Sequence, residues 1–231
     1  MSIFDSFVTS VKNASFNTVS NTFKSMTNRL QLVVYEEQEF NREASCTTLK
    51  LDFQSEYSLV ELDRNDSNVL SVTYQAKVID KNDSKVSVSF SHEADSLSLT
   101  FKDCMEEHNN PAKYFNLKDP SYQYVPLMFK VIIKIPKLSK FNLIINSKLC
   151  IFNHNQIPLK SLVFITSSLQ LSDFGTDSNR LELISKKGNI ELNNVKTKNI
   201  QAMSVLGAVH VSHTECNHIV LSANNGMDLH V

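Results

Sequence analysis

The stretch NRLELISKKGNIELNN, residues 179–194, decides how this chain folds. It is followed by KNIQAMSVLGAVHVSH, residues 198–213, which repeats the order of apolar and polar positions without any identical run of residues. Equivalent positions, such as Leu181 and Ile200, lie nineteen residues apart. A fixed spacing without sequence identity indicates that a pattern of burial repeats while the residues that fill it vary.

Three columns of residues keep this spacing through the C-terminal half of the chain. Residues of the first two columns are apolar and lie two positions apart in each repeat, which is the side-chain period of a β-strand. The third column is small and mostly hydroxylic, so it is expected to turn a corner by hydrogen bonding to the bending backbone. The columns are Leu143, Leu162, Leu181, Ile200 and Ile219; Ile145, Phe164, Leu183, Ala202 and Leu221; and Ser147, Thr166, Ser185, Ser204 and Ala223.

A second alternating apolar pair follows each corner and predicts a second strand in each repeat. The pairs are Leu149 and Ile151, Leu169 and Leu171, Ile190 and Leu192, Val209 and Val211, and Met227 and Leu229. Three of the four glycines, Gly188, Gly207 and Gly226, fall just after the corner. A residue without a Cβ atom tolerates positive φ there.

These features predict an all-β fold of the β-solenoid class, a single-stranded β-helix with coils of about nineteen residues and an N-terminal amphipathic helix. Successive coils would lie about 4.8 Å apart, so that side chains of equal phase stack. The alternative is an antiparallel sandwich with evenly spaced hairpins. Asn225-Gly226 is the only Asn-Gly hairpin signal in the chain, which favours the solenoid.

Three regions are predicted along the chain. Residues 1–33 form a helical leader, residues 34–128 an irregular β region with an excursion loop at 102–124, and residues 129–231 the regular coils. Ser2 and Asp5 resemble a capping box at the start of the leader. The leader has three interpretations: a cap on the first coil, a mitochondrial presequence, or a helix on a membrane surface.

The segment FKVIIKIPKLSKFNLIINS, residues 129–147, and the coils after it resemble the "putative adhesin" domains of the DUF4097 family. The resemblance covers about residues 45–231 and departs from the family at Lys148 and Ser168, where glycine is usual. It implies a single-stranded β-helix with an adhesin-like role, and some eukaryotic relatives look mitochondrial. The matching residues are Ile135, Pro136, Leu138, Leu143, Ile145, Gly188 and Gly207.

Composition excludes several classes of protein. The 23 Lys and Arg residues balance 24 Asp and Glu residues, so no field attracts nucleic acid. No apolar run is long enough for a transmembrane span or a secretory signal. The four cysteines are far apart and predict reduced thiols in an intracellular, cytoplasmic protein, with a mitochondrial location as the alternative. They are Cys46, Cys104, Cys150 and Cys216.

Two groups of polar residues are candidates for chemistry. The outward positions between the second-strand pairs are Cys150, Gln170, Glu191, His210 and Asp228. Stacked coils would bring Glu191, His210 and Asp228 into one outer column that could bind a divalent metal, or serve only as a solvated ladder of charges. The turn HTECNH carries His213, Cys216 and His218, which could ligate zinc but lack a fourth ligand. No cofactor is expected.

A third group is apolar and indicates binding. Ile165, Ile184 and Met203 form an outward column that something must cover, either another part of the chain or a protein partner. Ile144, Val163 and Val220 lie beside it. Met227, Leu229 and Val231 still alternate at the end of the sequence, which predicts self-association or a partner on the last coil.

The sequence therefore predicts a non-enzymatic scaffold that binds a protein partner, or itself, through its face or its C-terminal coil. The alternative function is that of a carbohydrate-active or metal-dependent enzyme that uses the outer column of Glu191, His210 and Asp228.

Overall fold

The computed structural model describes residues 33–43, 47–55, 57–78, 86–93, 95–103, 128–136, 141–155, 157, 159–167, 169–174 and 180–230. The predicted leader helix and most of the predicted excursion loop lie outside these residues, as does Val231. The interpretations of residues 1–32 therefore stay predictions. Across the described ranges, no helix is long and apolar enough to cross a membrane.

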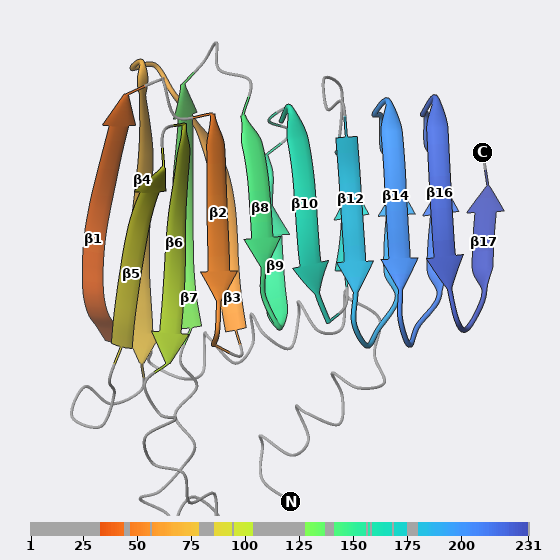
Figure 1. Ribbon diagram of the computed structural model, residues 1–231, viewed down its shortest axis with the longest axis horizontal. Coiled ribbons are helices and arrows are strands. Elements are labelled where there is room, and N and C mark those ends of the chain that lie inside the picture. The colour runs from red at the N-terminus through yellow and green to blue at the C-terminus, as the bar shows by residue number, and fades with distance from the viewer. Residues whose placement is uncertain are drawn as a thin grey trace, which may run out of the picture.

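The strands lie side by side in one long row, with the C-terminal strands at one end of the row (Figure 1). One wall of the row is an eight-stranded sheet. In spatial order its strands are β16 (His218–Ala223), β14 (Asn199–Ser204), β12 (Arg180–Ser185), β10 (Ser161–Thr166), β8 (Asn142–Asn146), β2 (Thr48–Phe53), β6 (Ser96–Asp103) and β5 (Val86–Glu93).

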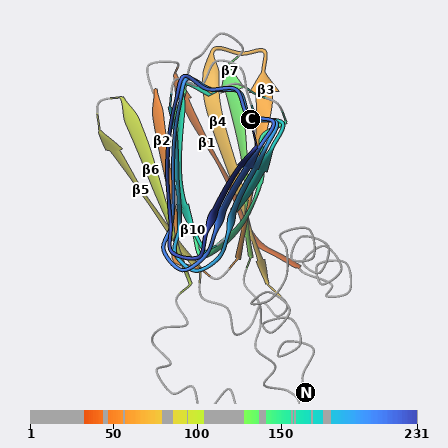
Figure 2. The same ribbon diagram turned by 90° about the vertical axis from the view of Figure 1, so that its right-hand side faces the viewer.

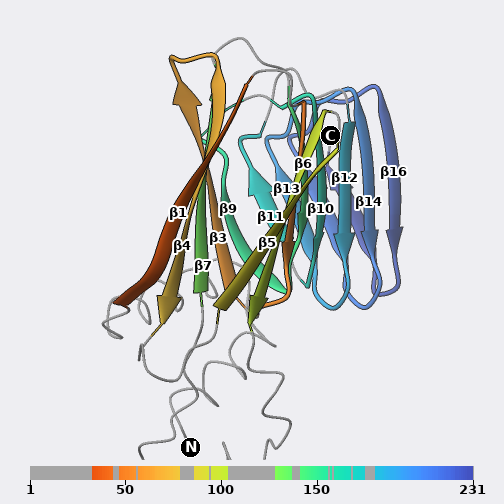
Figure 3. The ribbon, with the colours of Figure 1, turned by 60° about the vertical axis from the view of Figure 1, so that its left-hand side comes forward.

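Two further sheets make up the opposite wall (Figure 3). The four-stranded sheet has the order β11 (Leu169–Ser172), β13 (Ile190–Asn193), β15 (Val209–Ser212) and β17 (Met227–His230). The five-stranded sheet has the order β1 (Val33–Glu43), β4 (Val69–Val78), β7 (Met128–Pro136), β3 (Tyr57–Asn65) and β9 (Leu149–Asn153). Seen along the row, the walls face one another across the core (Figure 2).

The predicted nineteen-residue pairing is confirmed between neighbouring strands of the eight-stranded sheet. Leu162 pairs with Leu181, Leu181 with Ile200, and Ile200 with Ile219, in each case in parallel strands. The second strands pair in parallel too, so that Ile190 lies beside Val209. We call one strand of the eight-stranded sheet and the strand that follows it in the opposite wall a tier, and the last tier is β16 with β17.

The predicted fold class is wrong about the solenoid, and its N-terminal helix lies outside the described residues. The described residues form three sheets and no solenoid, and two of these sheets mix parallel with antiparallel pairs. The described residues also contain no helix, so the N-terminal amphipathic helix is not shown. The all-β part of the prediction is correct.

Short polar connectors explain why the first half of the chain departs from the prediction. Strand β3 ends at Asn65 and β4 begins at Val69, and the Asn65 side chain holds the turn by accepting from Ser67 N–H (3.0 Å) and donating to Val69 O (3.1 Å). Such a turn reverses the chain direction. Strand β4 is accordingly antiparallel to β7, which is parallel to β3.

Inward residues of both walls form one buried layer. The columns from Leu143 to Ile200 and from Ile145 to Ala202 are almost fully buried, which confirms their predicted phase. An aromatic cluster extends the layer toward the N-terminal strands, with Phe53 stacked on Phe101 at a centroid distance of 4.6 Å. Burial of this apolar surface is the main force that stabilises the fold.

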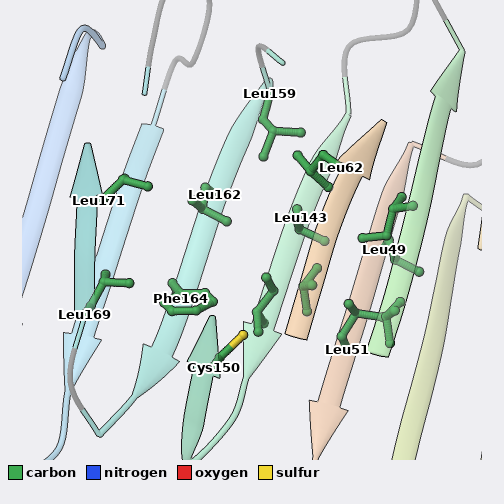
Figure 4. Close-up of a cluster of buried hydrophobic side chains, with 14 of the residues drawn as sticks. Leu49, Leu51, Leu62, Leu143, Cys150, Leu159, Leu162, Phe164, Leu169 and Leu171 are labelled. Carbon is green, nitrogen blue, oxygen red and sulfur yellow. The ribbon is translucent and has the colours of Figure 1, made fainter. Parts of the chain in front are cut away.

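In β9 the residue predicted to face outward is buried, and the two predicted to face the core are not. Cys150 is 5% exposed and projects into the same buried layer as Phe164 (Figure 4), whereas Leu149 and Ile151 are only half-buried. The reason is that β9 joins the five-stranded sheet and pairs with β3, where Cys150 lies beside the buried Ser58. Cys150 is therefore not a member of the outer column.

Buried hydroxyl groups hold the corners, as the third column predicts. The Thr166 hydroxyl donates to Lys148 O (3.2 Å), the Ser185 hydroxyl to Ser167 O (2.8 Å), and the Ser204 hydroxyl to Gly188 O (2.8 Å). Each of these bonds joins one tier to the preceding one. They add to backbone bonds that already join the corners, such as those from Ser167 N–H to Lys148 O (2.9 Å) and from Gly188 N–H to Ser167 O (2.6 Å).

The expected reason for the corner glycines holds at only one of them. Gly226 has a φ of 120°, which favours glycine, whereas neither Gly188 nor Gly207 has positive φ. Positive φ occurs instead in a column of other residues after the second strands: Asn155, Asp173, Asn194 and His213, with φ between 46° and 54°. Asn and Asp tolerate this conformation better than most residues.

Candidate functional site

Strand pairing brings the predicted outer column together. Glu191 lies beside His210, and His210 beside Asp228, in the parallel strands β13, β15 and β17. His210 Nδ1 lies 3.1 Å from an Asp228 carboxylate oxygen, and both side chains are well exposed. An exposed pair of this kind contributes little to stability and lies open to water.

The outer column does not form a metal centre. In the part of the chain that the structure describes, no group of three or more His, Cys, Asp and Glu side chains is placed to hold a metal ion. The three residues form a surface ladder in which one histidine contacts one carboxylate. Nothing in this geometry supports the enzyme interpretation.

The HTECNH turn does not gather its candidate ligands either. Cys216 packs against the core, and its partial burial raises the pKa of the thiol. His213 and His218 are exposed, and His213 Nδ1 lies 3.3 Å from the Asn193 side-chain oxygen. His213 and Cys216 lie in the connection between β15 and β16 rather than in a strand, and of the three candidates only Cys216 packs against the core.

The outward apolar column exists and is short. Ile165 lies beside Ile184, and Ile184 beside Met203, as predicted. The two isoleucines are half-buried and Met203 is 38% exposed. Ser222 follows Met203 in the next strand, so the column ends there.

The last tier exposes residues that the preceding tiers bury. Val209 and Val211 are 0% and 1% exposed, whereas Met227 and Leu229, which occupy the same phase one tier later, are 54% and 46% exposed. Ile219 and Leu221 in β16 are only partly buried. Core side chains thus reach the surface at the C-terminal end of the row.

The backbone of β16 also has groups that point away from the row. In parallel strands, a residue bonds through both N–H and C=O to one neighbouring strand, and the next residue points both groups to the other side. His218 N–H donates to Lys198 O (3.1 Å), so His218 and every second residue after it bond to β14. The backbone N–H and C=O groups of Ile219, Leu221 and Ala223 therefore point away from the row, where no described strand pairs with β16.

The same rule applies to β17. Val209 N–H donates to Gly226 O (3.1 Å), so Gly226 and Asp228 bond to β15. Met227 and Leu229 direct their N–H and C=O groups to the side where the described part of the chain supplies no strand. We call β16 and β17, with the outward groups of Ile219, Leu221, Ala223, Met227 and Leu229, the C-terminal edge.

The C-terminal edge lacks the usual protection of a sheet edge. Natural edge strands are often protected by charged residues, above all lysine, or by proline. Strands β16 (HIVLSA) and β17 (MDLH) contain neither lysine nor proline, and Asp228 is their only carboxylate. Strand β1, at the other end of the row, has the sequence VVYEEQEFNRE with five charged residues.

Sequence reasoning found part of this surface. Met227 and Leu229 are candidates from the sequence, as is Val220 beside the outward apolar column, and Val231 lies outside the described residues. Val205, Leu206 and Val220 extend the exposed apolar surface at the same end, with 41%, 57% and 61% exposure. The sequence carries a signal for two of them. Lys186 and Lys187 occupy the corner of one repeat, and the apolar Val205 and Leu206 occupy the same positions of the next repeat.

The chain has distant likenesses among solved structures. No family model and no curated protein matches it. A "putative cell adhesion protein" from Clostridium sporogenes matches with 11% identity over 83% of this chain and 96% of that chain, at a TM-score of 0.37. A "putative adhesin" from Bacteroides fragilis matches with 11% identity over 85% and 97%, at a TM-score of 0.34.

A "putative lipid binding protein" from Parabacteroides distasonis matches with 12% identity over 84% of this chain and 97% of that chain, at a TM-score of 0.28. Because the TM-scores are below 0.5, these likenesses do not show what this chain binds.

Proposed function

We propose that this protein is a non-enzymatic binding scaffold that takes up a β-strand of another polypeptide at its C-terminal edge. The observation that carries the proposal is the coincidence of outward backbone groups and exposed core-phase side chains on the same residues, Met227 and Leu229. An added strand would pair the backbone groups and cover the side chains at once. The proposal gives the chain an adhesin-like role and rests on the edge rather than on likeness to other proteins.

The geometry also defines what kind of strand fits. Main-chain hydrogen bonds supply affinity in strand addition, and alternate side chains supply specificity. The core-phase side chains of the edge are apolar, so a suitable strand has apolar residues at every second position. The side chains at the intervening positions of the added strand would face solvent beside His218 and Asp228, and are therefore polar in a suitable strand.

Amide hydrogen exchange of the dilute full-length chain tests whether the edge is free. The amides of Ile219, Leu221, Met227 and Leu229 should exchange at least about tenfold faster than those of Val220 and Asp228, because an amide without a ladder partner is not protected. Protection of the four outward amides that does not depend on chain concentration would mean that the chain covers its own edge. That result would contradict the proposal.

Binding is tested by affinity capture with matched variants of the full-length chain. Leu229→Pro removes an outward N–H and leaves the bonds to β15 intact, whereas Leu229→Ala keeps the N–H. Proteins bound through the edge should be captured by the wild type, by Leu229→Ala and by Met203→Ser, and lost with Leu229→Pro. Equal capture by all four would assign binding to another surface.

A further inference from the structure

The structure assigns the strand at the C-terminal edge to a second copy of this chain, related by a two-fold axis that passes through Leu221 and Leu229. This inference rests on the proposed function and names its partner. Both edge strands are exposed at the same end of the row, so one rotation can close both at once. A two-fold axis that crosses both walls places β16 antiparallel to β16 of the second copy, and β17 antiparallel to its counterpart.

Charge disfavours the opposite, head-to-tail arrangement. That arrangement would place β16 and β17 against β5 and β1, the strands at the far edges of the other end. Strand β1 carries five charged residues, and the C-terminal edge has one carboxylate and no lysine to pair with them. A tail-to-tail dimer avoids β1, and it is closed, since no edge of this kind remains for a third copy.

Backbone geometry fixes the register of β16. In an antiparallel pair, two directly opposite residues that point toward each other exchange both N–H···O bonds. The backbone N–H and C=O groups of Leu221 point away from the row. Leu221 opposite Leu221 of the second copy therefore forms such a pair on the axis. The same register places Ile219 opposite Ala223, both on the core side, and Val220 opposite Ser222, both on the solvent side.

The sequence of β17 selects the same axis. Ala223 and Met227 are the strand residues next to the corner at 224–226, and Leu221 and Leu229 each lie two residues farther from it. An axis through Leu221 therefore passes through Leu229. This register keeps Asp228 from lying directly opposite Asp228 of the second copy. A register centred on Asp228 would place two carboxylates opposite each other, which is destabilising.

The dimer would bury the apolar side chains that the last tier exposes. Leu229 and Met227, which are 46% and 54% exposed in the single chain, would meet their equivalents across the axis. Leu221 and Ile219 would complete the layer from the other wall. The two cores would then be continuous, as each tier's core is continuous with the next one.

Sedimentation equilibrium of the full-length chain is the first test. The wild type should be a dimer at micromolar concentration. Leu221→Pro should raise the dissociation constant at least about tenfold, because the substitution removes the same hydrogen bond from both copies. Leu221→Ala, which keeps the N–H, should dimerise better than Leu221→Pro. A monomeric wild type would overturn the second copy as partner, while the capture experiment would still test the proposed function.

Disulfide trapping tests the register. In the register centred on Leu221, residues 220 and 222 of the two copies are opposite, with Cα atoms about 4.5 Å apart, within the range of a disulfide. Two copies of residue 220 would be more than about 7 Å apart. Val220 and Ser222 are both exposed, so their replacement leaves the core intact.

The expected result is a disulfide-linked dimer only when Val220→Cys and Ser222→Cys chains are mixed and oxidised. The wild type, with its native cysteines, is the background control. Efficient crosslinking of Val220→Cys alone, or of Ser222→Cys alone, would overturn the axis through Leu221. A dimer that shows no mixed crosslink, or that withstands Leu221→Pro, would place the interface elsewhere and overturn the inference.

Discussion

A Cβ atom on Gly207 would lie 2.4 Å from both the carbonyl carbon and the carbonyl oxygen of Gly188. The two glycines stand one above the other at the corners of neighbouring tiers, and their backbones approach too closely for any side chain between them. Glycine is required here for space rather than for its conformational freedom, since neither residue has positive φ.

Gly207→Ala should therefore lower the free energy of unfolding by about 1–3 kcal/mol, because the overlapping atoms are backbone and the tiers must shift to relieve the contact. Urea denaturation measures the change. Lys187→Ala, at the exposed corner of the preceding tier, is the control and should change stability by less than about 0.5 kcal/mol. A Gly207→Ala variant as stable as the control would contradict the close contact of the corners.

The Ser204 hydroxyl joins the same two corners. It donates to Gly188 O (2.8 Å), accepts from Gly207 N–H (2.9 Å), and belongs to a residue that is 2% exposed. Ser204→Ala leaves the buried Gly207 N–H and the partly buried Gly188 O without this partner, so the free energy of unfolding should fall by about 1–3 kcal/mol. Ser91→Ala, on an exposed position of β5, is the control for urea denaturation and should be near neutral. Equal stability of the two variants would show that water replaces the Ser204 hydroxyl.

Neighbouring residues of β12 test the two faces of the eight-stranded sheet. Leu183 is fully buried, and Ile184 is half-buried on the outer face. Leu183→Ala should cost about 2–5 kcal/mol of unfolding free energy, because it leaves a cavity in the core. Ile184→Ala should cost less than half as much, as judged by urea denaturation. A larger loss for Ile184→Ala would mean that another segment covers the outer column.

The pairing of the C-terminal strands could be predicted because one spacing governs it. Leu162, Leu181 and Ile200 occupy the same phase of successive repeats, and in-register parallel pairing follows from that phase. The inward phase of the hydroxyl column followed in the same way. The apolar alternation of Met227 and Leu229 likewise indicated the unprotected edge, which is a local property of the sequence.

The mixed sheets could not be predicted from such a pattern. Strand β7 lies between β3 and β4, although β3 and β4 are joined by a short turn and β7 comes some sixty residues later. The alternation within a strand does not specify that β7 lies between β3 and β4, because each of the three strands could bury its apolar face beside many other strands. The solenoid prediction extended the C-terminal periodicity to a class for the whole fold, and the antiparallel pairs contradict it.

Cys150 shows how a single shift of phase misleads sequence reasoning. The apolar Leu149 and Ile151 alternate as the later core pairs do, and the sequence alone assigns them to the core. Strand β9 pairs with β3 instead of β11, and its register with Ser58 turns Cys150 inward. A displacement of one residue exchanges the two faces of a strand, so only the identity of the partner strand decides which face is buried.

The buried thiol of Cys150 makes the stability of the protein depend on pH. Burial raises the pKa of Cys150 from its ordinary value of 9.0 to about 12, because the thiolate is poorly solvated in the core. The unfolded chain therefore loses this proton near pH 9 while the folded chain keeps it. The contribution to stability is fully present below about pH 9 and is lost as the pH rises toward about 12. Urea midpoints measured from pH 8 to pH 10.5 should fall more steeply for the wild type than for Cys150→Ala, whereas parallel profiles would show that Cys150 ionises equally in both states.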